Sequence, residues 1–169
     1  MRFRLEFPLE EVAALAERFG PTDEVAVADA GRAAAERGHY TKPELVLLCE
    51  WKSARSRSRV ARNTDEFVER ITAAAFATAD EHERMAALCV LRGVDRPSAS
   101  VLLHFAFPDR YPIIDWRALE SLGQRSGPPY SMAFWLDYVE GCRTLAEQAG
   151  VSLRVLDKAL WQYSTERPR

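Results

Sequence analysis

The fold is decided by the stretch at residues 91–103 of the 169-residue chain, which reads LRGVDRPSASVLL. A segment with the apolar spacing of a helix ends just before this stretch, and a second one begins inside it. Gly93 stands at the break between them, where glycine can adopt a tight turn without steric cost. We therefore predict a helix-hairpin-helix near residues 88–103 with Gly93 at its bend.

This hairpin has the features of a phosphate-binding turn. Backbone N–H groups at the start of a helix attract anions, so a phosphate can be held without many side-chain charges. Asp95 complicates this prediction, because its carboxylate would repel an anion, although aspartate tolerates the left-handed conformation that such a turn requires. Two neighbouring arginines either compensate for that charge or pair with Asp95. The predicted DNA-binding residues of the hairpin are Arg92, Gly93, Val94, Asp95, Arg96 and Ser98.

Outward from the hairpin, apolar residues recur with helical spacing throughout and never alternate for long, which predicts an all-α protein. Its length suits one domain spanning residues 1–169. Capping-box spacing from Asn63 to Glu66 and from Thr78 to Glu81 predicts two of the helix starts. A turn is expected at 126–129. The predicted helices lie near 9–19, 25–36, 42–52, 64–77, 79–91, 97–107, 115–123, 131–149 and 152–164.

The charge balance excludes a protein that coats nucleic acid by bulk electrostatics, because the net charge is −2 and the pI is about 6.0. A local basic segment nevertheless lies at residues 52–62, where five cations occur without an acid. Arg55, Arg57 and Arg59 are its candidate DNA contacts. The alternative interpretation is a solvated connecting loop.

The cysteines and the apolar runs bound the protein class further. Cys49, Cys89 and Cys142 are odd in number, widely spaced and set in apolar helical contexts, which argues against disulfides and metal clusters. No apolar run is long enough to cross a membrane, and the first residues lack the pattern of a signal peptide. We therefore expect a cytoplasmic protein with no membrane partner and no metal.

The stretch from Leu91 to Leu119 resembles the helix-hairpin-helix signature of the DNA glycosylase superfamily, which includes endonuclease-III-like and 8-oxoguanine DNA glycosylase-like enzymes. The residues that match the signature of that family directly are Leu91, Gly93, Val94 and Ala99. The lysine position of the family falls on Pro97, and its aspartate position falls on Asp115, 18 residues later. The resemblance implies a two-lobed helical bundle with Asp115 as the catalytic carboxylate.

Departures from the family pattern bear on function. Pro97 has no amine, so it cannot form the imine intermediate of strand-cleaving members, and the resemblance then implies a monofunctional glycosylase. The four-cysteine iron–sulfur cluster of some members is absent, because Cys142 is the last cysteine, and no cofactor is expected. Asp115 before Trp116 is also an ordinary helix N-cap, and the two interpretations are compatible.

In the resembling fold the substrate pocket lies between the two lobes, with Asp115 on one wall. The candidates for the opposite wall are Trp51, Lys52 and Arg55, because tryptophan stacks on an extruded base while lysine and arginine reach phosphate. Trp116 is a further candidate beside Asp115. The alternative for both tryptophans is an ordinary core position, and His104 on its apolar helix is interpreted as a buried structural histidine.

Four functional hypotheses remain open at this point. The leading one is a monofunctional DNA N-glycosylase that removes a damaged or modified base, with Asp115 catalytic. The second is a nucleic-acid-binding module of the same fold that has lost its chemistry, which the missing lysine and Asp95 favour. The third is a protein for nucleosides or another small ligand, and the last is a helical scaffold for a protein partner. Folding alone does not require a carboxylate at position 115, which argues against the scaffold.

Overall fold

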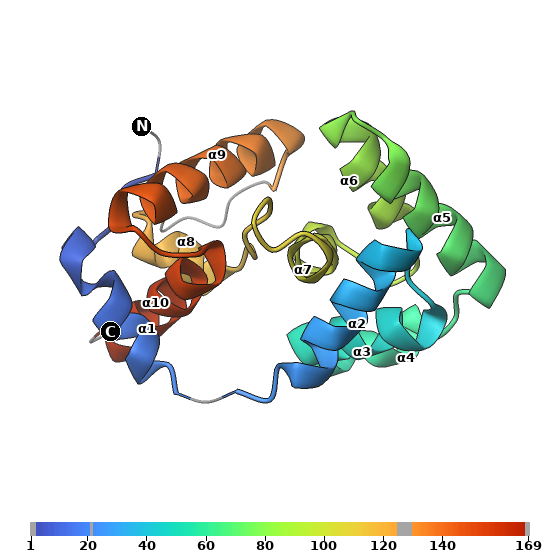
Figure 1. Ribbon diagram of the computed structural model, residues 1–169, viewed down its shortest axis with the longest axis horizontal. Coiled ribbons are helices and arrows are strands. Elements are labelled where there is room, and N and C mark those ends of the chain that lie inside the picture. The colour runs from blue at the N-terminus through green and yellow to red at the C-terminus, as the bar shows by residue number, and fades with distance from the viewer. Residues whose placement is uncertain (1–2, 21, 125–129, 168–169) are drawn as a thin grey trace. The chain divides into compact units, whose positions relative to one another are not determined.

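The structure is a computed structural model that describes residues 3–20, 22–124 and 130–167, and this part of the chain is helical without a strand (Figure 1). The all-α prediction is confirmed. The predicted turn at 126–129 lies outside the described residues. The α-helices are α1 (Val12–Arg18), α2 (Val25–Arg37), α3 (Lys42–Lys52), α4 (Arg57–Val60), α5 (Asp65–Ala77), α6 (Glu81–Val90), α7 (Arg96–Ala106), α8 (Trp116–Ser121), α9 (Met132–Ala149) and α10 (Leu153–Glu166), and the short 3-10 helices are η1 (Leu9–Glu11) and η2 (Ala54–Ser56).

The chain divides into two compact units. One consists of residues 1–22 and 108–169, and the other of residues 23–107. The predicted hairpin and the basic segment belong to the second unit, whereas Asp115 belongs to the first.

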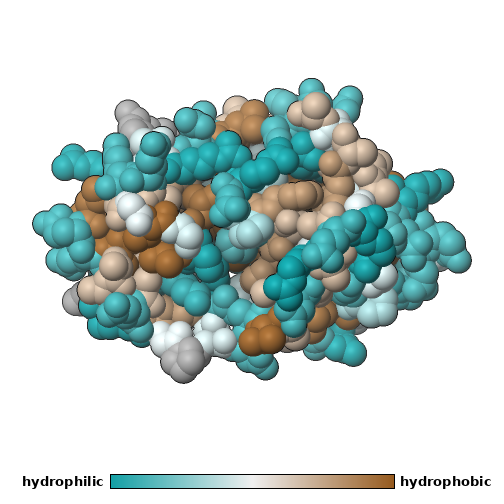
Figure 2. Space-filling view, viewed as in Figure 1, coloured by the Kyte–Doolittle hydropathy of each residue, from teal (hydrophilic) through white to brown (hydrophobic). Residues whose placement is uncertain are grey.

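The unit of residues 23–107 is built around α7. Every residue of α7 from Ser98 to Ala106 is buried, and α2, α3 and α6 pack on it. The approach of α2 is close: a Cβ atom added at Gly31 would lie 2.2 Å from the backbone oxygen of Phe105. The opposite face of α2 is exposed at Asp29, Arg32 and Glu36, and Figure 2 shows hydrophilic side chains along it.

The unit of residues 1–22 and 108–169 packs α1 and α8 on the closing helix α10. The predicted C-terminal helix is confirmed, with Leu153, Leu156 and Leu160 on its buried face. Phe3 contacts the rings of Phe134 and Tyr138 edge-on, so the N-terminal segment packs on α9. The same unit buries Ala118, Leu119 and Ser121 of α8, the helix that follows Asp115.

Two predicted helix starts are wrong by one or two residues. The N-cap of α5 is Thr64 rather than Asn63, and the N-cap of α6 is Asp80 rather than Thr78. Asp80 accepts hydrogen bonds from two backbone N–H groups, whereas the Thr78 hydroxyl accepts one from the N–H of Asp80. Asn63 does not cap α5 because its side chain binds the backbone groups of Val60 and Arg92 instead.

The remaining predictions about class concern membranes and cysteines. Over the residues that the structure covers, no helix is long and apolar enough to span a membrane. All three cysteines are free thiols, with Cys49 and Cys142 buried and Cys89 partly exposed. Burial raises the pKa of the Cys49 thiol to about 12, so this thiol is an inert core group at neutral pH.

Candidate nucleic-acid interface and the Asp115 site

The predicted hairpin is present between α6 and α7. The chain turns at Gly93, whose φ of +79° lies in the left-handed region, and the N–H of Val94 donates to the carbonyl of Leu91 at 3.1 Å. Glycine is favoured there because a side chain would clash with its own backbone. The turn that the sequence predicts at Gly93 therefore joins the two helices, and its identity as the hairpin of the resembling family stays a prediction.

Asn63 holds the hairpin in place through its side chain. Its Oδ1 accepts from the backbone N–H of Arg92 at 2.9 Å, and its Nδ2 donates to the carbonyls of Arg92 at 3.0 Å and Val60 at 2.8 Å. The side chain is 4% exposed, so these bonds satisfy a buried amide. This role of Asn63 could not be predicted from the sequence, because the partner of its side chain is a backbone group 29 residues away.

The hairpin also packs tightly against the basic segment. A Cβ atom at Gly93 would lie 2.9 Å from the Cβ of Arg59 and 2.9 Å from Cγ2 of Val60. Two basic stretches that are separate in the sequence are therefore brought into contact. The basic segment is partly helical, because η2 and α4 lie within it, so the alternative interpretation of a plain connecting loop does not describe its backbone.

Asp95 is not the left-handed residue of the turn. Its backbone is extended, with φ −104°, and it is the N-cap of α7, where its Oδ1 accepts from the N–H of Ser98 at 3.0 Å and from the Ser98 hydroxyl at 2.8 Å. In the described part of the chain it forms no ion pair with Arg92 or Arg96. The Asp95 carboxylate thus binds the backbone N–H of Ser98, a group that was expected to face a phosphate. The hydrogen-bond donors that this surface can offer to an anion are then the arginine side chains.

The arginines around the hairpin differ in how exposed they are and in whether they are paired with an acid. Arg57 forms an ion pair with Glu50, whereas Arg55 and Arg59 are exposed. Arg96 is partly buried, and its Nε finds no hydrogen-bond acceptor among the described residues. Arg92 is exposed, beside the backbone that Asn63 binds. These side chains give the hairpin side of the unit a local excess of positive charge.

Asp115 is the N-cap of α8, as the sequence indicates. Its backbone is extended, and its Oδ1 accepts from the N–H of Ala118 at 2.8 Å. The preceding Ile113 and Ile114 are buried, and the Tyr138 hydroxyl donates to the carbonyl of Ile113 at 2.8 Å. The carboxylate is therefore held at a partly exposed position by a rigid neighbourhood.

An exposed tryptophan adjoins this carboxylate. Trp116 is 54% exposed, which excludes the core position that was its alternative interpretation. The guanidinium of Arg117 lies 4.4 Å from the ring centroid of Trp116 and 5.0 Å from that of Trp161. A cation held against an exposed aromatic face, next to a carboxylate, offers a surface on which a flat ligand can stack.

The candidates for the opposite wall lie at the end of α3. The Trp51 ring meets the Phe105 ring edge-on at 5.2 Å and is partly buried, and Lys52 follows it at the last residue of the helix. His104 is 2% exposed and contacts the Phe105 ring, which confirms it as a buried histidine. That Trp51 and Lys52 share a pocket with Asp115 stays a prediction of the resemblance.

Comparisons with known proteins add no relative. No protein-family model, no curated protein and no solved structure matches the chain. In the part of the chain that the structure covers, no cluster of three or more histidine, cysteine or acidic residues is placed to hold a metal ion. The features that point to a function are therefore the hairpin, the arginines around it and the Asp115 segment.

Proposed function

We propose that this protein is a monofunctional DNA N-glycosylase that contacts the DNA backbone through its hairpin side. The observation that carries the proposal is the packing of the Gly93 turn directly on Arg59 and Val60, which joins the hairpin and the basic segment into one cationic surface. Local cations of this kind suit a protein with a net charge of −2, because phosphate contacts need only a few well-placed side chains.

Asp115 is the proposed catalytic group. A carboxylate stabilises the positive charge that develops on the sugar as the base departs, and it orients the water that attacks. The hydrogen bond from the N–H of Ala118 orients the Asp115 carboxylate. The adjacent exposed Trp116 provides an aromatic face for a base. Pro97 supplies no amine, so the proposed reaction is hydrolysis without a covalent imine.

The test is base release from oligonucleotides that carry uracil, 8-oxoguanine, alkylated adenine or deaminated purines, scored as abasic sites after alkaline cleavage. Asp115→Asn should lower the rate of release by at least about 100-fold, the usual loss when one charge-stabilising group is removed. The fold should persist, because asparagine is as good an N-cap as aspartate.

Asp80→Asn is the matched control. Asp80 is likewise an N-cap aspartate, and it accepts from the N–H groups of His82 and Glu83 at the far end of α6 from the hairpin. The same chemical change there should leave base release intact. Release that survives Asp115→Asn would refute the catalytic role of Asp115. Trapping of a protein–DNA adduct by borohydride would refute the monofunctional mechanism.

The second candidate function is a DNA-binding module without chemistry. The observation in its favour is the Asp95 cap on α7, which places a carboxylate where the family resemblance implies a phosphate. This alternative predicts no base release from any oligonucleotide of the panel. It also predicts salt-dependent DNA binding that Asp115→Asn leaves unchanged and that charge removal at Arg55, Arg57 and Arg59 weakens.

A further inference from the structure

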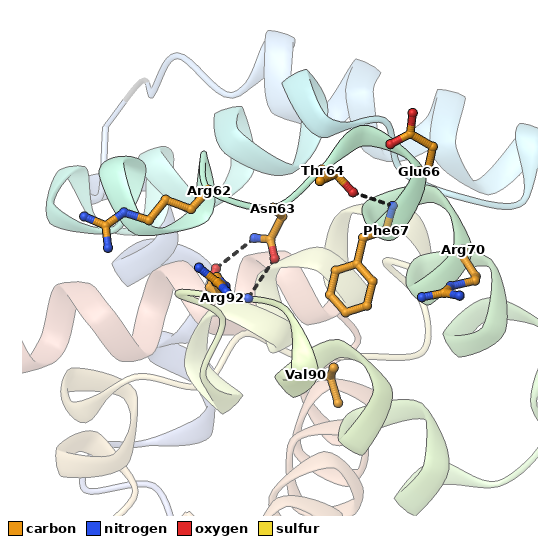
Figure 3. Close-up of a pocket in the computed structure, with 8 residues that line it drawn as sticks. All are labelled: Arg62, Asn63, Thr64, Glu66, Phe67, Arg70, Val90 and Arg92. Atoms are coloured by element: carbon orange, nitrogen blue, oxygen red, sulfur yellow. Dashed lines mark hydrogen bonds between the residues drawn. The ribbon is translucent and has the colours of Figure 1, made fainter.

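A hollow of about 620 Å³ lies on the unit of residues 23–107, beside the hairpin. It lies between the start of α5 and the end of α6, and neither the family signature nor the predicted site includes its centre. Figure 3 shows Phe67 pointing into the middle of this hollow, with Val90 below it. The residues of its lining that could contact a ligand include Arg62, Phe67, Arg70, Val90 and Arg92.

Three arginines supply the charge of the hollow. Arg70 and Arg92 lie on opposite sides of Phe67, and Arg62 extends the row beyond Arg92 (Figure 3). None of their guanidinium groups forms a hydrogen bond or ion pair with another described residue. Glu66, the acid of the lining, points away from the Phe67 ring (Figure 3). The hollow therefore has cationic groups on both sides of an aromatic ring, and no described acid forms an ion pair with them.

The apolar part of the hollow is exposed. Val90 is 59% exposed although it is a large aliphatic residue, and Phe67 is partly exposed. Thr64 fixes the Phe67 backbone, since its hydroxyl accepts the Phe67 N–H at 3.2 Å. The Arg70 guanidinium lies 5.6 Å from the centroid of the Phe67 ring. An aromatic ring with an arginine beside it is the arrangement on which unpaired bases stack.

We propose that this hollow binds an unpaired nucleotide segment of a DNA strand, with its phosphates on Arg92 and Arg70 and a base against Phe67 and Val90. Alternating cations and aromatic faces are what a single strand requires, because its phosphates carry charge and every base has a face that can stack. A duplex keeps its bases stacked inside and would use only the arginines. The choice of DNA as the bound strand rests on the proposed function.

The test measures the binding of a fluorescein-labelled oligothymidylate of ~12 nucleotides, within the length that such sites cover, by fluorescence anisotropy at several salt concentrations. Phe67→Leu keeps the apolar floor but removes the ring, and it should weaken binding roughly 5- to 150-fold, the usual loss for one stacked base. Arg70→Gln should weaken binding and reduce the slope of log K against log salt by about 0.7.

Two further variants serve as controls. Arg32→Gln removes one exposed positive charge from α2 in the same unit, outside the hollow, and should leave the affinity and the salt slope unchanged. Glu66→Gln removes the acid of the lining and should tighten binding. Urea denaturation of each variant separates a loss of affinity from a loss of folding.

The outcomes decide separately about this hollow and about the proposed function. Unchanged binding in both Phe67→Leu and Arg70→Gln, or the absence of binding to the single strand, would overturn the proposal for the hollow even if base release from duplex DNA is observed. Single-strand binding that depends on Phe67 and Arg70 would uphold it even if no base is released, in which case the glycosylase proposal fails alone. If the corresponding oligouridylate binds more tightly than the oligothymidylate, the strand that this hollow binds is RNA and the choice of DNA is wrong.

Discussion

Replacement of Gly93 by alanine tests how the hairpin is held. Two separate costs arise at this position: alanine must adopt a φ of +79°, and its Cβ must lie 2.9 Å from both the Arg59 Cβ and the Val60 Cγ2. A left-handed backbone costs about 1–2 kcal/mol for a residue with a Cβ. Overpacking of a tight contact costs about 1–3 kcal/mol more. Gly93→Ala should therefore lower the free energy of unfolding by about 2–5 kcal/mol.

Gly38→Ala is the matched control within the same unit. Gly38 ends α2 with a φ of +92°, but a Cβ there would meet nothing within 4 Å. This variant carries the backbone cost alone, so we expect a loss of about 1–2 kcal/mol. Both substitutions restrict the unfolded chain to the same extent, so that contribution cancels in the comparison. The difference between the two variants isolates the contact between hairpin and basic segment.

Urea denaturation followed by far-ultraviolet circular dichroism gives both losses, provided that the m-values of the variants agree. A second probe in the unit of residues 23–107 is needed, because two compact units need not unfold together. Equal losses in Gly93→Ala and Gly38→Ala would refute the argument that the hairpin and α4 are in tight contact, and with it the single cationic surface on which the proposed function depends.

Two further predictions concern the packing of α2 and the surface of the other unit. Gly31→Ala should lower stability by about 1–3 kcal/mol in the same assay despite the better helix propensity of alanine, because its Cβ would meet the rigid backbone oxygen of Phe105 at 2.2 Å; an unchanged midpoint would contradict that contact. Hydrogen bonds from the Arg18 guanidinium and then from the Gln162 side chain lower the pKa of the Glu166 carboxyl from 4.5 to about 2. The stability from these bonds is therefore fully present above pH 4.5 and is lost as the pH falls toward 2. Glu166→Gln should therefore show a shallower acid-induced loss of stability over that range, and an acid profile identical to that of the wild type would contradict this assignment.

Local sequence signals predicted the helices well and the helix starts less well. The spacing of apolar residues placed α5 and α9 within a residue of their observed bounds, since a helix must bury one face whatever packs on it. Capping boxes were less reliable at Asn63 and Thr78. Several polar side chains near a helix start can accept the same N–H groups, and tertiary contacts decide among them.

The candidate site was predictable only in part. Gly93 and Asp115 could be located because each serves a local requirement, a left-handed turn at one and a helix N-cap at the other. Phe67 and Arg70 gave no such signal. An aromatic residue and an arginine on an amphipathic helix have the pattern of any surface helix, and only the approach of the end of α6 makes them the lining of a hollow.

The sequence by itself determined that this protein is helical, where its longer helices lie and that a turn at Gly93 joins α6 to α7, because these features depend on interactions between residues close together in the chain. It did not predict α4, which lies inside the basic segment. Only the tertiary structure decided that Asn63 binds the backbone of Arg92 and that the basic segment packs on the hairpin. Those contacts join residues about thirty positions apart. A buried amide must form hydrogen bonds, and only the packing of the helices decides which unpaired backbone groups lie beside it.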